Sequence, residues 1–222
     1  MRDRIGQSVS VFAILVALIW ASPASAENLI YNGDFELGDV GFNTDYPNAP
    51  QTFGYQIVRN PNEDWYSGFA SFGDHTTGDG FMLAVDGATI LNQVVWEQTV
   101  TLPIQQLYDF SVWVAPMSSP NPADLEFQIE QGGINRRLGG LKLSSEPGVW
   151  TKFSRRFIVG PQIQTGPATI KIVNMETAGV GNDFALDDLR LSVIPEPSTL
   201  VLVGLAMPFG IGLWMRQRRK SA

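Results

Sequence analysis

Apolar residues alternate with polar ones along short stretches of this chain, and residues 27–194 show no convincing helical repeat of apolar side chains. The clearest case is Tyr108, Phe110, Val112 and Val114, which would all point to one face of a strand. The other alternating stretches are Phe81–Val85, Leu125–Ile129, Phe153–Val159 and Ile170–Ile172. About eight such strands predict an all-β domain in which two antiparallel sheets form a sandwich.

Turns are expected where glycine and proline cluster between these stretches. Such clusters occur at Pro116–Pro122, Gly132-Gly133, Gly139-Gly140 and Glu146–Gly148. The segment Gly38–Gly80 differs, because it is rich in Asn, Pro, Gly and aromatic residues and has only one strand-like piece, Tyr55–Arg59. Long irregular insertions are usually functional or disordered, and the aromatic residues argue against disorder.

The N-terminus has the three parts of a secretory signal peptide. Arg2 and Arg4 precede an apolar stretch from Val9 to Trp20, and Ala24 and Ala26 form a small-x-small cleavage site. We therefore predict a signal peptide over residues 1–26, cleavage after Ala26, and export. The alternative is a buried helix, which the proline and small residues after the apolar stretch disfavour.

The C-terminus carries a second hydrophobic segment, Thr199–Met215, followed by a basic end, Arg216–Lys220. It lies at the short end of the roughly 17–25 residues that cross a bilayer, and the trailing cations fit a cytoplasmic end. We predict a transmembrane helix over residues 199–215. A plain tail anchor is one interpretation of this segment.

The motif Pro195-Glu196-Pro197 directly before that segment makes the tail more specific. Together with the apolar stretch and the Arg-rich end, it resembles the PEP-CTERM sorting signal of Gram-negative bacteria. The resemblance assigns residues 194–222 to a sorting signal. It implies processing by an exosortase, anchorage in the inner membrane before processing, a later place at the cell surface or in the extracellular matrix, and an association with exopolysaccharide.

The charge of the central domain excludes some partners. Residues 27–194 contain 20 carboxylates and 9 Lys or Arg, a net charge of −11. So acidic a domain should repel nucleic acid and anionic lipids, while remaining compatible with neutral sugars and divalent cations. The chain has no cysteine, so an exported domain of this kind must be stabilised by its core.

The two ends of the domain carry a further resemblance. It opens with Asn28–Glu36 (NLIYNGDFE) and closes with Asp183–Leu191 (DFALDDLRL), with paired central stretches at Val95–Leu102 and Leu107–Val114. This pattern resembles the galactose-binding-like jelly rolls, which include many carbohydrate-binding modules. The resemblance implies a jelly-roll domain over residues 27–193 with its first and last strands side by side.

Acidic residues gather at those two ends. The alternation changes parity between Leu186 and Leu189, which predicts a β-bulge at Asp187 and Asp188. Many members of the family hold a structural Ca²⁺ where the end strands meet, and Ca²⁺ takes six to eight oxygen ligands. The resemblance therefore makes four acids candidate ligands: Asp34, Glu36, Asp187 and Asp188. In the alternative, the acids are solvated and paired with Arg190 or Lys171.

Catalysis has few candidate residues, because the domain holds one histidine, His75, and no cysteine. His75 lies between Asp74 and Asp79, but a catalytic zinc usually needs three protein ligands and no second histidine is present. We interpret His75 as a hydrogen-bonded turn residue and predict no catalytic residue, zinc site or organic cofactor.

Sugar binding needs flat aromatic faces beside polar groups. Trp65 and Tyr66 lie among polar residues in the insertion, as does Tyr46, and Trp113 lies on the strand face opposite Tyr108. Each of these side chains could instead belong to the core, where tryptophan is usually mostly buried.

These observations predict a non-catalytic exported surface or matrix protein that is associated with exopolysaccharide and binds carbohydrate. One alternative is a structural or adhesion protein that binds protein partners and has no sugar affinity. A third interpretation is a polysaccharide-modifying enzyme.

Overall fold

The structure is a computed structural model that describes residues 26–49, 52–160 and 166–194. Within these ranges no helix is long and apolar enough to cross a membrane. Most of the predicted signal peptide, including Ala24, lies outside the described residues, as do the sorting motif Pro195–Pro197 and the predicted helix over 199–215.

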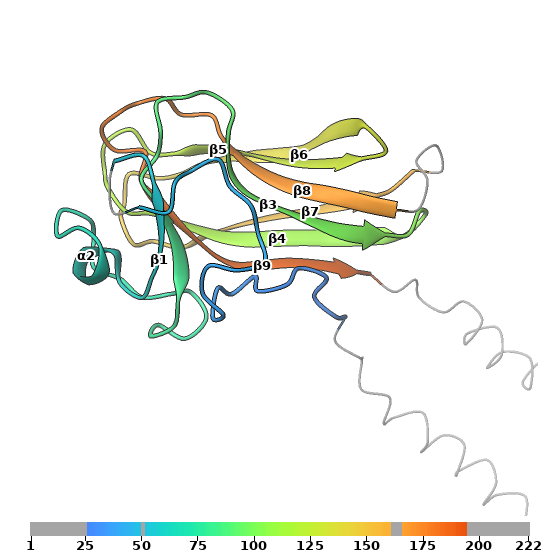
Figure 1. Cartoon of the computed structure of the whole chain (residues 1–222), viewed down its shortest axis with the longest axis horizontal. Coiled ribbons are helices and arrows are strands. Elements are labelled where there is room, and N and C mark those ends of the chain that lie inside the picture. Colours follow the sequence, from blue (N-terminus) through green and yellow to red (C-terminus); the bar gives the residue numbers. More distant parts are fainter. Residues whose placement is uncertain (1–25, 50–51, 161–165, 195–222) are drawn as a thin grey trace, which may run out of the picture.

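Two antiparallel sheets face one another as two layers (Figure 1). The five-stranded sheet has the order β1 (Tyr55–Val58), β2 (Met82–Val85), β9 (Phe184–Val193), β4 (Leu107–Pro116) and β7 (Thr151–Ile158). The four-stranded sheet has the order β3 (Gln93–Leu102), β8 (Gly166–Asn174), β5 (Asp124–Gln131) and β6 (Ile134–Lys142). The prediction of an all-β, two-sheet antiparallel sandwich is therefore confirmed.

The core lies between the two layers, where the alternating residues of both sheets meet. Phe127 of β5 stacks on Phe153 of β7 with ring centroids 3.8 Å apart, and Phe110 of β4 lies 6.1 Å from Phe127. The alternate residues Leu125 and Ile129 of β5 are buried in the same cluster. The alternation in the sequence thus marks the face of each strand that is buried.

One predicted turn is wrong, because Gly139 and Gly140 lie inside β6. A Cβ on Gly139 would lie 2.9 Å from the ring of Phe153, so the missing side chain makes room for that ring in the core. The pairing with β5 also shifts register between Phe127 and Gln128. Here the glycines mark a close approach inside a strand rather than a turn.

The insertion covers the outer face of the five-stranded sheet. Phe69 packs there against Met82, Met117 and Ala185 in a second buried cluster, with Trp65 partly buried beside it. The insertion also contains the short helix α2 (Pro61–Asp64), which the sequence did not predict and which lies at the β1 end of the sandwich (Figure 1). Trp65, Phe69 and Phe72 of the insertion thus pack on this outer face, whereas Phe42, Tyr46, Phe53 and Tyr55 pack in or against the main core.

The N-terminal segment runs along β9, as the resemblance implied, although it forms no regular strand. The backbone N–H of Leu29 donates to the carbonyl of Leu191 at 2.7 Å, and that of Leu189 donates to Gly33 at 2.8 Å. The side chain of Asn28 bonds to Leu189 and Leu191 of β9 at 3.0 and 2.9 Å. A Cβ on Gly33 would lie 2.1 Å from the carbonyl oxygen of Leu189, so this close approach requires glycine.

Truncation of Phe127 should be costly, because its ring is fully buried between the sheets. We expect Phe127→Ala to lower the free energy of unfolding of the full-length protein by about 3–5 kcal/mol. Ile134→Ala, at a 52% exposed position in β6, should cost less than about 1 kcal/mol. Denaturant unfolding monitored by tryptophan fluorescence measures both, and equal losses would contradict the described core.

Candidate functional site

The predicted bulge lies on β9 and is confirmed. Along β4, Ser111 pairs with Arg190 whereas Trp113 pairs with Asp187, so one residue of β4 faces two residues of β9. Asp188 has the left-handed φ of 50°. The bulge leaves Asp187 fully buried and Asp188 partly exposed.

The loop between residues 73 and 81 supplies the partners of these two acids. Asp187 is fully buried, and its Oδ2 accepts hydrogen bonds from the backbone N–H groups of His75 at 2.8 Å and Thr76 at 3.3 Å. Nδ1 of His75 lies 2.6 Å from Asp188 Oδ2, and the hydroxyl of Thr76 donates to Asp188 Oδ1 at 2.7 Å. The interpretation of His75 as a hydrogen-bonded turn residue is confirmed.

The other two predicted calcium ligands also have protein partners. Glu36 Oε1 accepts from the N–H of Phe81 at 2.7 Å, and Asp34 Oδ1 accepts from the N–H of Glu36 at 3.4 Å. In the described part of the chain no three acidic, histidine or cysteine side chains are grouped so that they could hold a metal. In this arrangement the four acids accept hydrogen bonds from the protein, and the calcium site stays a prediction.

The alternative partners of these acids are also placed elsewhere. Arg190 donates to the carbonyl oxygen of Ala26, and Lys171 bonds to Glu130 at 2.8 Å. The hydrogen-bond partners of Asp187 and Asp188 are therefore in the loop around His75, and neither of these cations pairs with them.

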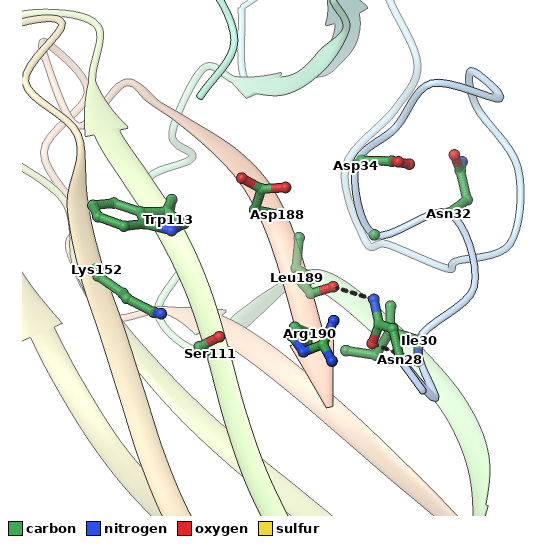
Figure 2. Close-up of a pocket in the computed structure, with 11 residues that line it drawn as sticks. Asn28, Ile30, Asn32, Asp34, Ser111, Trp113, Lys152, Asp188, Leu189 and Arg190 are labelled. Atoms are coloured by element: carbon green, nitrogen blue, oxygen red, sulfur yellow. Dashed lines mark hydrogen bonds between the residues drawn. The ribbon is translucent and has the colours of Figure 1, made fainter. Parts of the chain in front are cut away.

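Trp113 borders a polar cavity of about 430 Å³ (Figure 2). Lys152 and Asp188 line the same cavity from the neighbouring strands β7 and β9. Trp113 is partly exposed on the outer face of β4, as its strand position predicted, but the ring of His75 stacks on it with centroids 3.9 Å apart. Nζ of Lys152 also lies 5.7 Å from the centre of the indole ring. The two side chains limit access to this ring.

Tyr46 is only 3% exposed, so the prediction that it offers a stacking surface to a sugar is wrong. Its hydroxyl oxygen accepts hydrogen bonds from the N–H of Ala88 and from the side chain of Asn174, each at 3.2 Å. Burial raises the pKa of the Tyr46 hydroxyl. The N–H of Asp45 donates to the carbonyl of Val94, and the N–H of Val94 donates to the Asp45 carboxylate. These bonds tie the segment to β3, so the ring lies in the core and offers no face to a sugar.

The two remaining aromatic candidates line one cavity of about 520 Å³, which we call the Trp65–Tyr66 pocket. Trp113 and Tyr46 are not part of its lining. Its wall consists of Thr52, Trp65, Tyr66, Gly68, Phe69, Asp86, Ser118, Pro120, Gly179, Val180, Gly181 and Asp183.

The aromatic wall of this pocket is held in place. Tyr66 is 60% exposed, yet its ring meets the buried ring of Phe69 edge-on at 5.3 Å, and Trp65 meets Phe69 at 5.4 Å. The side-chain amide of Asn62 donates to the carbonyls of Ser67 and Phe69, both at 2.8 Å. A braced ring loses little conformational freedom when a ligand stacks on it.

Sheet pairing brings two carboxyl groups together in the same pocket. Val85 at the end of β2 pairs with Phe184 at the start of β9, so Asp86 and Asp183 lie directly beyond that pair. Their carboxyl groups hydrogen-bond to one another, and the hydroxyl of Ser118 donates to Asp183 Oδ2 at 2.7 Å. Burial, with the nearby charge of Asp86, raises the pKa of Asp183 to about 7, and burial raises that of Asp86. The pair therefore shares a proton in mildly acidic solution.

The sequence reasoning missed this acid pair. Asp86 directly follows the predicted strand Phe81–Val85, and Asp183 directly precedes Phe184, which placed each acid at a strand end. The missing information was that these two strands are neighbours, since about a hundred residues of chain separate them and no local pattern fixes long-range pairing.

Comparisons with known proteins identify the fold. No protein-family profile matches the sequence, and no curated protein matches it either. The Stig cyclase Fisc of Fischerella sp. TAU aligns over 77% of this chain and 99% of its own, with a TM-score of 0.56 and 15% identity. The CBM22-1–CBM22-2 tandem domain of Xyn10C from Paenibacillus barcinonensis aligns over 79% of this chain, with a TM-score of 0.53 and 14% identity. The alignment spans about half of that tandem domain, 49%. These likenesses establish the jelly-roll fold that carbohydrate-binding modules share with such cyclases, and at this identity nothing finer.

The acid pair should make stability depend on pH. The pKa of Asp183 is about 7 in the folded protein and near its ordinary value in the unfolded chain. Folding is therefore favoured by the bound proton below about pH 4, and this advantage is lost as pH rises to about 7. Relative to Asp183→Asn, the wild-type protein should lose on the order of 1–3 kcal/mol of unfolding free energy between pH 4 and pH 7.

Denaturant unfolding of both proteins across this pH range measures the difference. Asp109→Asn, a substitution on β4 outside the pocket, is the matched control and should follow the wild type. A difference between wild type and Asp183→Asn that does not vary with pH would show that Asp183 is ionised throughout.

Proposed function

We propose that this chain is a non-catalytic exported protein whose sandwich domain binds carbohydrate in the Trp65–Tyr66 pocket. The observation that carries the proposal is an exposed aromatic ring, Tyr66, braced beside the hydrogen-bonding groups of Asp86, Asp183 and Ser118. Sugar rings stack on aromatic faces, while carboxyl and hydroxyl groups orient their hydroxyls. The pocket offers both kinds of contact within one cavity.

The delivery of the protein is part of the same proposal. The N-terminal leader, the motif Pro195-Glu196-Pro197, the apolar stretch 199–215 and the basic end support sorting by an exosortase-type enzyme. The protein would be anchored in the inner membrane first and would then reach the cell surface or the extracellular matrix. Exopolysaccharide in that matrix is the carbohydrate that the pocket would meet.

Removal of the Tyr66 ring should weaken binding. We expect Tyr66→Ala to reduce retention of the full-length protein in polysaccharide-containing gels, with a loss of affinity of about tenfold or more. Tyr31→Ala is the matched control, because Tyr31 is 59% exposed and is not among the pocket residues. Affinity electrophoresis through neutral, acidic and amino-sugar polymers, including the matrix of the producing organism, makes the measurement.

The same experiment separates this proposal from a structural or adhesion role. If the wild-type protein is retained by none of these polymers, the carbohydrate-binding proposal is wrong and a protein-binding matrix role is favoured. If Tyr66→Ala and Tyr31→Ala lose affinity equally, sugars bind, but not in the Trp65–Tyr66 pocket.

A further inference from the structure

The charges in the Trp65–Tyr66 pocket all have one sign. Asp86 and Asp183 are the charged residues of its wall, and no lysine, arginine or histidine is among the described residues that line it. The pairing of β2 with β9 also places these two acids next to one another, directly beyond the Val85–Phe184 pair. A wall of this kind is poorly matched to a carboxylated or sulfated sugar.

We infer that the Trp65–Tyr66 pocket recognises an amino sugar through its free ammonium group, with the ring stacked on Tyr66 and the ammonium beside Asp86 and Asp183. This inference rests on the proposed carbohydrate binding and names the class of sugar. A glucosamine-type residue of a partly deacetylated polymer has this chemistry.

Two features of the pocket and one of the whole domain favour a cation over a neutral group. A positive charge near carboxylates forms charge-assisted hydrogen bonds, which are stronger than those between neutral groups. The electron-rich faces of Trp65 and Tyr66 attract cations as well as sugar rings. The net charge of −11 on residues 27–194 further concentrates cationic polymers near the domain.

Binding of an ammonium group should be linked to release of the shared proton. Among the described residues, the titratable groups that act on the pair are the two acids themselves and the buried hydroxyl of Tyr46, whose raised pKa keeps it neutral throughout this range. Ser118 contributes a neutral hydroxyl. Because the pKa of Asp183 is about 7, the pair holds a proton at pH 5–6 when the pocket is free. An ammonium ion replaces that proton, and an N-acetylated sugar does not.

Calorimetric titration of the full-length protein with glucosamine oligomers and with N-acetylglucosamine oligomers of equal length tests the inference. At pH 6 we expect the glucosamine oligomer to bind about tenfold more tightly than its acetylated counterpart. Its affinity should rise about tenfold from pH 5 to pH 6, where the amine stays charged, whereas the affinity of the acetylated oligomer should not change. Heats measured in buffers of different ionisation enthalpy should show about one proton released per site.

Two variants and one control assign the effect to the acid pair. Asp183→Asn and Asp86→Asn should each bring the ratio of the two affinities toward one and remove the pH dependence. Asp109→Asn makes the same charge change on β4, away from the pocket wall, and should keep both effects. Melting curves confirm that the variants are folded. If one of them does not fold, the other decides the outcome together with the buffer-dependent heats of the wild type.

A third probe, polylysine, separates recognition of an amino sugar from attraction to any polycation. Polylysine that binds as tightly as the glucosamine oligomer, or an unchanged affinity ratio in both Asn variants, would overturn the inference. Equal binding of the acetylated and free oligomers at pH 6 would overturn it while leaving carbohydrate binding intact. Absence of binding by either oligomer and by every polymer in the gels would overturn both proposals.

Discussion

The position of β9 between β2 and β4 is the constraint on which the rest of the structure depends. This strand is the last one of the described domain, and the N-terminal segment lies along it, since Leu29 and Gly33 form hydrogen bonds with its backbone. Its hydrophobic residues Leu186, Leu189 and Leu191 are buried in the main core. Without this strand the five-stranded sheet would divide into the strand pairs β1–β2 and β4–β7, and the N-terminal segment would lose its backbone partners.

The Trp65–Tyr66 pocket and the cavity beside Trp113 both border β9. Asp183 stands directly before β9 and forms the acid pair with Asp86, whereas Asp188 at the bulge borders the cavity beside Trp113. The two carboxyl environments differ in their partners. The acids at the bulge accept hydrogen bonds from the loop around His75, which satisfies them within the protein. The acid pair in the Trp65–Tyr66 pocket shares a proton and faces a cavity, so it is the more available of the two for a ligand.

The sequence predicted the two sheets of the fold better than it predicted which residues line the cavities. Alternation around Phe110 and Phe127 identified the buried faces correctly, because burial of one face leaves a repeat of two in the sequence. Gly139 was misread, because a glycine that makes room for a ring of another strand looks the same in sequence as a glycine in a turn. Tyr46 was proposed as a stacking residue from its place in the insertion and Trp113 from its strand face, but the exposure of an aromatic ring depends on which loop folds over it. The acid pair depends on strand order, which no local pattern contains.

The direction of β9 distinguishes the two ends of the sandwich. Its first residue lies beside the Trp65–Tyr66 pocket and its last lies at the opposite end of the sandwich, where Ala26 and Ile194 also leave the described domain (Figure 1). An extended strand of this length spans roughly 30 Å. Attachment through either terminus would thus place about the length of this strand between the point of attachment and the Trp65–Tyr66 pocket.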